Sequence, residues 1–189
     1  MRILGIDPGL TRCGIGVIDA GLQRDVHLVH VEVVQSPAAM QLAERLALIA
    51  AGITTAFDTF APDRVAIERV FAQQNLRTVM GTAQISGIAI YEANRRGIPV
   101  EFHTPSEVKA AVTGNGRADK KQIANMVQRL LNMPDVRMLP DATDALALAI
   151  CHSWRGSPSA PIDGRQTLTP AQQKWRDAER QGRPTKLKP

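Results

Sequence analysis

The chain opens with Met1-Arg2-Ile3-Leu4-Gly5-Ile6-Asp7-Pro8-Gly9, a short apolar run that ends at an acidic residue and a Pro-Gly turn. A second apolar run, 15–18, follows Gly14, and the two runs predict a β-hairpin. The run 26–34 alternates apolar with polar residues over most of its length, which predicts a half-exposed third strand. Three antiparallel strands therefore begin the fold.

Beyond these strands the apolar residues recur every three or four positions, the period of a buried helical face. We expect helices over 37–60, 76–96, 118–132 and 141–154, with strands between them over 65–68 and 99–102. Pro62 ends the first of these helices. The alternation of strands with helices predicts an α/β fold.

Length and composition indicate one globular domain with some additional chain. Of the 189 residues, 44% are hydrophobic and 22% charged, so the chain can bury a core and is neither wholly disordered nor collagen-like. Two cysteines are too few for a disulfide scaffold and fit a reducing compartment. The sequence has neither an apolar signal region nor an apolar run long enough to span a membrane. We therefore expect a cytoplasmic protein.

Charge is distributed unevenly along the chain. Residues 1–154 hold 15 Lys and Arg against 15 Asp and Glu, whereas residues 155–189 hold 8 against 3, so the net charge of +5 belongs to the second segment. That segment is also rich in Pro, Gly, Ser and Gln. We predict a folded domain over 1–154 and a flexible basic tail over 155–189, with at most one short helix near 170–181.

Four acidic residues stand where an ordinary surface charge is unexpected. Asp7 and Glu68 end apolar strands, and Asp141 and Asp144 share one face of the first turn of an apolar helix. Taken singly, Asp7 is typical of a turn, and the helical pair is typical of a capped N-terminus. If the first and fourth strands are neighbours, however, right-handed crossover connections bring both strand-end carboxylates to the same edge of the sheet.

Carboxylates gathered in this way repel one another unless a cation binds them. Oxygen ligands without His or Cys at ligand spacing indicate Mg²⁺ or Mn²⁺ rather than Zn²⁺. Two such ions about 4 Å apart can stabilise both the attacking and the leaving oxygen of a phosphoryl displacement. The four acids therefore predict metal-dependent hydrolysis of a phosphodiester. His152, two helical turns beyond Asp144, has apolar neighbours and is interpreted as a core residue.

Four motifs follow one another along the chain: Gly5-Ile6-Asp7-Pro8-Gly9, Ile67-Glu68-Arg69-Val70-Phe71, Gly114-Asn115-Gly116-Arg117-Ala118-Asp119-Lys120 and Asp141-Ala142-Thr143-Asp144-Ala145-Leu146-Ala147. In this order they resemble the motifs of the RuvC family of bacterial Holliday junction resolvases. The resemblance covers residues 1–152 and implies an RNase H-like fold, a five-stranded mixed sheet flanked by helices. It also implies a homodimer that nicks opposing strands of four-way junction DNA in pairs, using two Mg²⁺ ions per subunit, for which Mn²⁺ can substitute.

The resemblance assigns roles to individual residues as well. The residues that match the family's catalytic, metal-binding acids are Asp7, Glu68, Asp141 and Asp144. Phe71 matches an aromatic residue that stacks on bases at the junction centre, although a lone Phe after a strand is more often part of a core. Lys109 and Lys120 match basic residues near the scissile phosphate, where a cation stabilises developing charge. The partners implied in the same way are the RuvA and RuvB branch-migration proteins.

Two other functions remain open from the residues alone. An Asp-x-Gly turn after a first strand also occurs in actin-like and sugar-kinase ATPases, but those proteins place two such domains around the nucleotide. This chain predicts one domain and has no P-loop. The other alternative is a protein that binds junctions without cleaving them, and the presence of all four acids argues against it.

Overall fold

A computed structural model of the chain describes residues 1–69, 76–133 and 138–155. The elements follow in chain order as β1 (Arg2–Asp7), β2 (Arg12–Ala20), β3 (Val26–Gln35), α1 (Leu42–Phe60), β4 (Arg64–Glu68), α2 (Leu76–Arg95), β5 (Val100–His103), α3 (Pro105–Thr113), α4 (Lys120–Leu130) and α5 (Pro140–Arg155). All of them belong to one compact unit, Met1–Gly156. The predicted tail lies outside the described residues, so its flexibility stays a prediction.

The strands form a single mixed sheet in the order β3-β2-β1-β4-β5. β1 pairs antiparallel with β2, and β2 with β3, whereas β4 pairs parallel with β1 and with β5. This confirms the five-stranded mixed sheet and the adjacency of the first and fourth strands. β1 is central, and its apolar residues Ile3, Leu4 and Ile6 are fully buried because helices cover both faces of the sheet.

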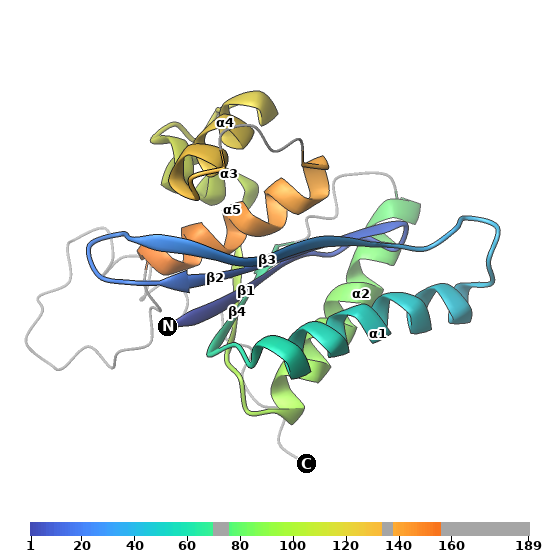
Figure 1. Ribbon diagram of the computed structural model, residues 1–189. Helices are drawn as coiled ribbons and strands as arrows, with labels where there is room; N and C mark the ends of the chain where they lie inside the picture. The colour runs from blue at the N-terminus through green and yellow to red at the C-terminus, as the bar shows by residue number, and fades with distance from the viewer. Residues whose placement is uncertain (70–75, 134–137, 156–189) are drawn as a thin grey trace, which may run out of the picture. The chain divides into compact units, whose positions relative to one another are not determined.

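The helices form a layer on each side of the sheet (Figure 1). α5 crosses one face, and α3 and α4 pack against α5, while α1 and α2 pack together on the other face. Successive β1 side chains point to opposite faces, so Ile3 packs in the core beneath α5, and Leu4 and Ile6 pack in the core beneath α1 and α2. The two cores hold the sheet between them.

One helix was not expected from the sequence pattern. α3 lies between the predicted strand at 99–102 and the predicted helix at 118–132, and its start is a capping box: the Thr104 hydroxyl accepts from the Glu107 backbone N–H at 3.2 Å, and the Glu107 carboxylate accepts from the Thr104 N–H at 2.8 Å. Gly114, with φ +76°, ends it.

The first predicted helix begins at Leu42 rather than at 37. None of the described helices is both long and apolar enough to cross a membrane.

Candidate active site

The ends of β1 and β4 bring two of the predicted acids together. The parallel register pairs Ile6 with Ile67, so the next residue on each strand, Asp7 and Glu68, lies at the same edge of the sheet. This follows from parallel pairing, because adjacent parallel strands have their carboxyl ends at a common edge. The edge predicted from the sequence is therefore present.

Helix α5 brings the other two acids to this edge because glycines let its backbone lie against the sheet. A Cβ atom added to Gly14 would stand 2.0 Å from the Asp141 carbonyl oxygen, and one added to Gly5 would stand 2.0 Å from the Ala145 carbonyl oxygen. A side chain at either position would clash with the helix backbone. The first turn of α5, with Asp141 and Asp144, therefore lies beside the strand ends.

All four acids and both predicted lysines line one cleft of about 320 Å³. The cleft-lining residues are Asp7, Glu68, Pro105, Val108, Lys109, Lys120, Ile123, Asp141, Asp144 and Leu148. They come from strands β1 and β4 and from helices α3, α4 and α5. The unexpected α3 thus forms part of the wall of the cleft.

Burial and mutual repulsion act strongly on Asp7. Desolvation, followed by the charges of Glu68, Asp144 and Asp141, raises the pKa of Asp7 from its ordinary 3.8 to about 7, against a smaller opposing effect of Lys120. A carboxyl group with a pKa near neutrality is typical of functional sites. A divalent cation would relieve this repulsion, so the environment of Asp7 fits a metal ligand.

The two lysines offset part of this negative charge. Burial raises the pKa of Glu68 and of Asp144, and Lys120 and Lys109 oppose the rise in both cases. Lys120 makes the closest contact, with its Nζ 3.4 Å from Asp144 Oδ2. The cleft therefore combines four acids with two cations that face them.

Asp141 has an oxygen that the fold leaves without a hydrogen bond. Its Oδ2 is buried and receives no hydrogen bond from the described residues, although Arg12 Nε lies 2.8 Å away as an ion-pair partner. Buried carboxylate oxygens are normally hydrogen-bonded, so this atom, whose partner is the Arg12 cation alone, keeps lone pairs that can bind a metal ion. Sequence reasoning did not identify Arg12, because nothing in the pattern of β2 distinguishes it from a surface arginine.

The remaining predicted positions have different outcomes. Phe71 lies outside the described residues, so its role stays a prediction. Arg12 and Asp141 also line a second cleft of about 490 Å³, together with Arg45. His152 does not line the carboxylate cleft and is 2% exposed, in agreement with its interpretation as a core residue.

An RNase H-like sheet with carboxylates gathered at one edge defines a class of proteins, the RNase H-like nucleases. Comparison with known proteins identifies the branch of this class. The family model for crossover junction endodeoxyribonuclease RuvC matches residues 3–152. The chain therefore belongs to the RuvC family of crossover junction endodeoxyribonucleases, and it is an endonuclease that hydrolyses phosphodiester bonds. Family membership excludes the phosphotransferase alternative.

Individual relatives agree with this assignment. The chain is 53% identical to the crossover junction endodeoxyribonuclease RuvC of Leifsonia xyli subsp. xyli, over 95% of this chain and 92% of that protein. It is 58% identical to the one of Frankia casuarinae, over 82% of this chain and 91% of that protein. The structure of T. thermophilus RuvC in complex with Holliday junction substrate matches with a TM-score of 0.77 and 31% identity, over 82% of this chain and 94% of that one.

Proposed function

We propose that this chain resolves Holliday junctions by paired nicking of opposing strands, with Asp7, Glu68, Asp141 and Asp144 as its catalytic, metal-binding acids. The observation that carries the proposal is the gathering of these carboxylates in one cleft, from two strand ends and one helix. The T. thermophilus relative with the same fold was solved with a Holliday junction substrate, which supports junction DNA as the substrate here.

The proposed cofactor is Mg²⁺, two ions per subunit, with Mn²⁺ able to substitute. The four carboxylates offer only oxygen ligands, and the raised pKa of Asp7 and the Asp141 Oδ2 atom, which receives no hydrogen bond from the described residues, both fit a cation. Bound ions of this kind lower the pKa of an attacking water and stabilise charge on the phosphate. Asp7 must lose its proton to act as a ligand, so this site binds metal best above about pH 7.

The cations around the cleft are the proposed phosphate ligands. Lys109 and Lys120 face the acids from α3 and α4, where an ammonium group can stabilise charge that develops on the scissile phosphate. Arg12 and Arg45 line the second cleft, which shares Asp141 with the first and offers positive charge to an adjoining stretch of DNA backbone. Phe71 keeps its proposed role of stacking on bases at the junction centre.

A homodimer is part of the proposal because paired nicking needs two active sites. Helix α2 exposes large apolar side chains along one stripe: Met80 is 55% exposed, Ile90 38% and Tyr91 65%. Gly87 lies in the same stripe, and a Cβ atom added there would meet nothing within 4 Å. The stripe therefore offers an open apolar surface for close contact with a second copy of α2.

The proposal extends to location and partners. A junction DNA substrate supports a cytoplasmic location, and the buried, unpaired Cys13 and Cys151 fit a reducing compartment. The RuvA and RuvB branch-migration proteins are proposed partners on the basis of family resemblance alone.

The test is cleavage of a labelled four-way junction beside a linear duplex of the same sequence, with Mg²⁺ or Mn²⁺ added. Symmetric, ligatable nicks confined to the junction, and lost in Asp7→Asn, are the expected result. Junction binding without nicks under either metal would instead indicate a binding protein, and equal cleavage of the duplex would indicate a general nuclease.

A further inference from the structure

A second group of ligand-type side chains lies at the edge strand of the sheet, away from the carboxylate cleft. Glu101 and His103 lie on β5, and His152 lies near the end of α5. None of the three lines the cleft of the four acids. His152 is eight residues beyond Asp144, which is about 12 Å along the helix.

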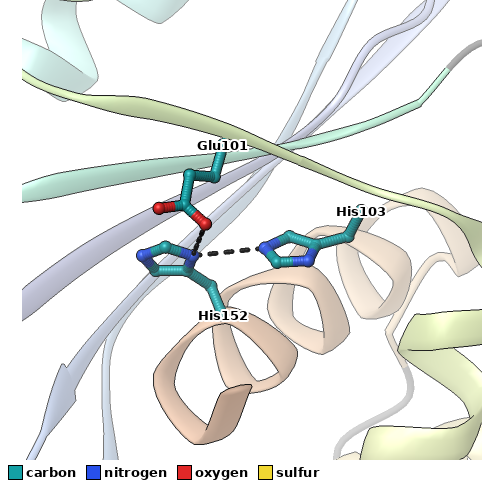
Figure 2. A group of neighbouring side chains, drawn as sticks. All are labelled: Glu101, His103 and His152. Atoms are coloured by element: carbon teal, nitrogen blue, oxygen red, sulfur yellow. Dashed lines mark hydrogen bonds and ion pairs between the residues drawn. The ribbon is translucent and has the colours of Figure 1, made fainter. Parts of the chain in front are cut away.

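The three side chains point toward one another (Figure 2). His103 Nε2 lies 3.2 Å from His152 Nδ1, and Glu101 Oε2 lies 3.8 Å from the same His152 nitrogen. One ligand atom from each residue lies within 4.8 Å of the other two. A tetrahedral ion with ligands at about 2.0–2.1 Å separates neighbouring ligand atoms by about 3.3 Å, which matches the distance between the two histidine nitrogens and requires Glu101 to move closer.

Burial fixes the two histidines and leaves the carboxylate adjustable. His103 is 6% exposed and His152 is 2% exposed, so their rings are held by packing. The Glu101 side chain is 21% exposed on an edge strand, so it can move by the small amount needed and gives an ion access from solvent. Burial also lowers the pKa of both histidines, which favours the neutral imidazole that binds metals.

We propose that Glu101, His103 and His152 form a second metal site, selective for a transition ion of the Zn²⁺ type, that links β5 to the last turns of α5. Two imidazoles and one carboxylate are a common ligand set for Zn²⁺ and a poor one for Mg²⁺, which prefers oxygen ligands. The ligand type therefore distinguishes this site from the carboxylate cleft. A bound ion would stabilise the fold, because it joins the edge of the sheet to the helix that bears Asp144.

The proposed site is independent of the proposed catalytic function, and the experiment separates the two. The chain of residues 1–189, stripped of metal with a chelator, is titrated with Zn²⁺ in the presence of excess Mg²⁺, which is added to occupy the proposed oxygen ligands of the cleft. We expect one Zn²⁺ per chain and a raised melting temperature. With Co²⁺ in place of Zn²⁺, we expect the visible absorption of a nitrogen-ligated, four-coordinate ion.

The variants assign this binding to its residues. His152→Gln, His103→Gln and Glu101→Gln should each weaken Zn²⁺ binding at least 10-fold, whereas His27→Gln, on the exposed part of β3, and Asp7→Asn should leave it unchanged. Glu101→Gln alters a partly exposed side chain, so it provides the test even if the buried histidine variants fold poorly. Zn²⁺ binding that is absent in the unaltered protein, or that survives Glu101→Gln at full affinity, would overturn the proposal.

Discussion

Burial of the Asp7 carboxyl group in the proposed metal site lowers the stability of the fold when no metal is bound. Its pKa rises from 3.8 to about 7, so between these values the folded chain holds a proton that the unfolded chain has lost. Stability without metal therefore falls as pH rises through this window, and the loss is complete above about pH 7. The shift corresponds to at most about 4 kcal/mol.

The fall in stability with rising pH gives the first prediction. In a chelating buffer, Asp7→Asn should unfold at a higher temperature than the unaltered protein at pH 8, and the difference should shrink towards pH 5. Added Mg²⁺ should reverse the order at pH 8, because the unaltered protein gains a ligand and its repulsion is relieved. Thermal unfolding followed by circular dichroism at both pH values measures this, and a difference that grows towards pH 5 would contradict it.

Lys120 allows catalysis to be separated from stability. Its Nζ lies 3.4 Å from Asp144 Oδ2, but the side chain is 78% exposed, so the ion pair contributes little to folding. Lys120→Gln should slow junction cleavage about 10- to 100-fold, with little change in melting temperature. The matched control is Lys121→Gln, which removes the same charge from an exposed neighbour that does not line the cleft. Equal rates for the two variants would mean that Lys120 has no specific role.

At the scale of elements, the contact of α5 with the sheet sets the position of two acids. Gly14→Ala would place a methyl group 2.0 Å from the Asp141 carbonyl oxygen, so the helix start must shift. We expect a stability loss of about 1–3 kcal/mol and a cleavage rate, per folded molecule, about 100-fold lower. The rate is measured with saturating junction DNA.

The control for this prediction is a substitution that causes a clash in the other helical layer, formed by α1 and α2. Gly52 lies on α1, and Gly52→Ala would bring a methyl group to 2.5 Å from a Val34 side-chain atom; neither residue lines the carboxylate cleft. It should also lower stability, but cleavage per folded molecule should be retained. If both variants lose cleavage equally, the defect comes from general destabilisation and not from displacement of Asp141.

The same elements show what the sequence could predict. The acids at Asp7 and Glu68 were predictable because each ends an apolar strand and neighbouring parallel strands end at one edge. α3 was missed because only Val108 and Val112 of its residues are buried, too few to show a helical period. Its capping box, with Pro105 in the first turn, was the available signal.

Contacts between distant segments were beyond sequence reasoning. His103 and His152 are 49 residues apart and share no motif spacing, so only the packing of α5 on β5 reveals that their rings meet. The ion pair between Arg12 and Asp141 is similar, because it depends on the same helix crossing the start of β2. When one helix brings together side chains from distant parts of the sequence, they can be recognised as neighbours only once the fold is known.

At the scale of the whole molecule, the basic tail gives a prediction from charge alone. Residues 155–189 hold 8 Lys and Arg against 3 Asp and Glu. Chains that end at Trp154 should bind junctions with a weaker dependence on salt concentration, because fewer counterions are released from DNA. Paired nicking should persist, since all four acids remain. Binding measured from low to high salt checks this, and an unchanged slope would show that the tail makes no phosphate contacts.

If the proposed dimer forms through the apolar stripe of α2, a charge placed in that stripe should separate the two active sites. Tyr91→Asp places a charge on a surface that a dimer would bury, so the proposed dimer should dissociate into monomers during sedimentation. Leu22→Asp, at a position that is 88% exposed in the turn between β2 and β3, is the control and should leave the mass unchanged.

Cleavage of a supercoiled plasmid with an extruded cruciform then reports on pairing. Two coordinated nicks linearise the plasmid, whereas one nick relaxes it and the cruciform is reabsorbed before a second cut. The Tyr91→Asp chain should therefore produce nicked circles, and the Leu22→Asp chain should produce linear molecules. If Tyr91→Asp remains dimeric and still yields linear DNA, the two-fold contact lies elsewhere, because a charge buried in the centre of an apolar interface would be too costly to tolerate.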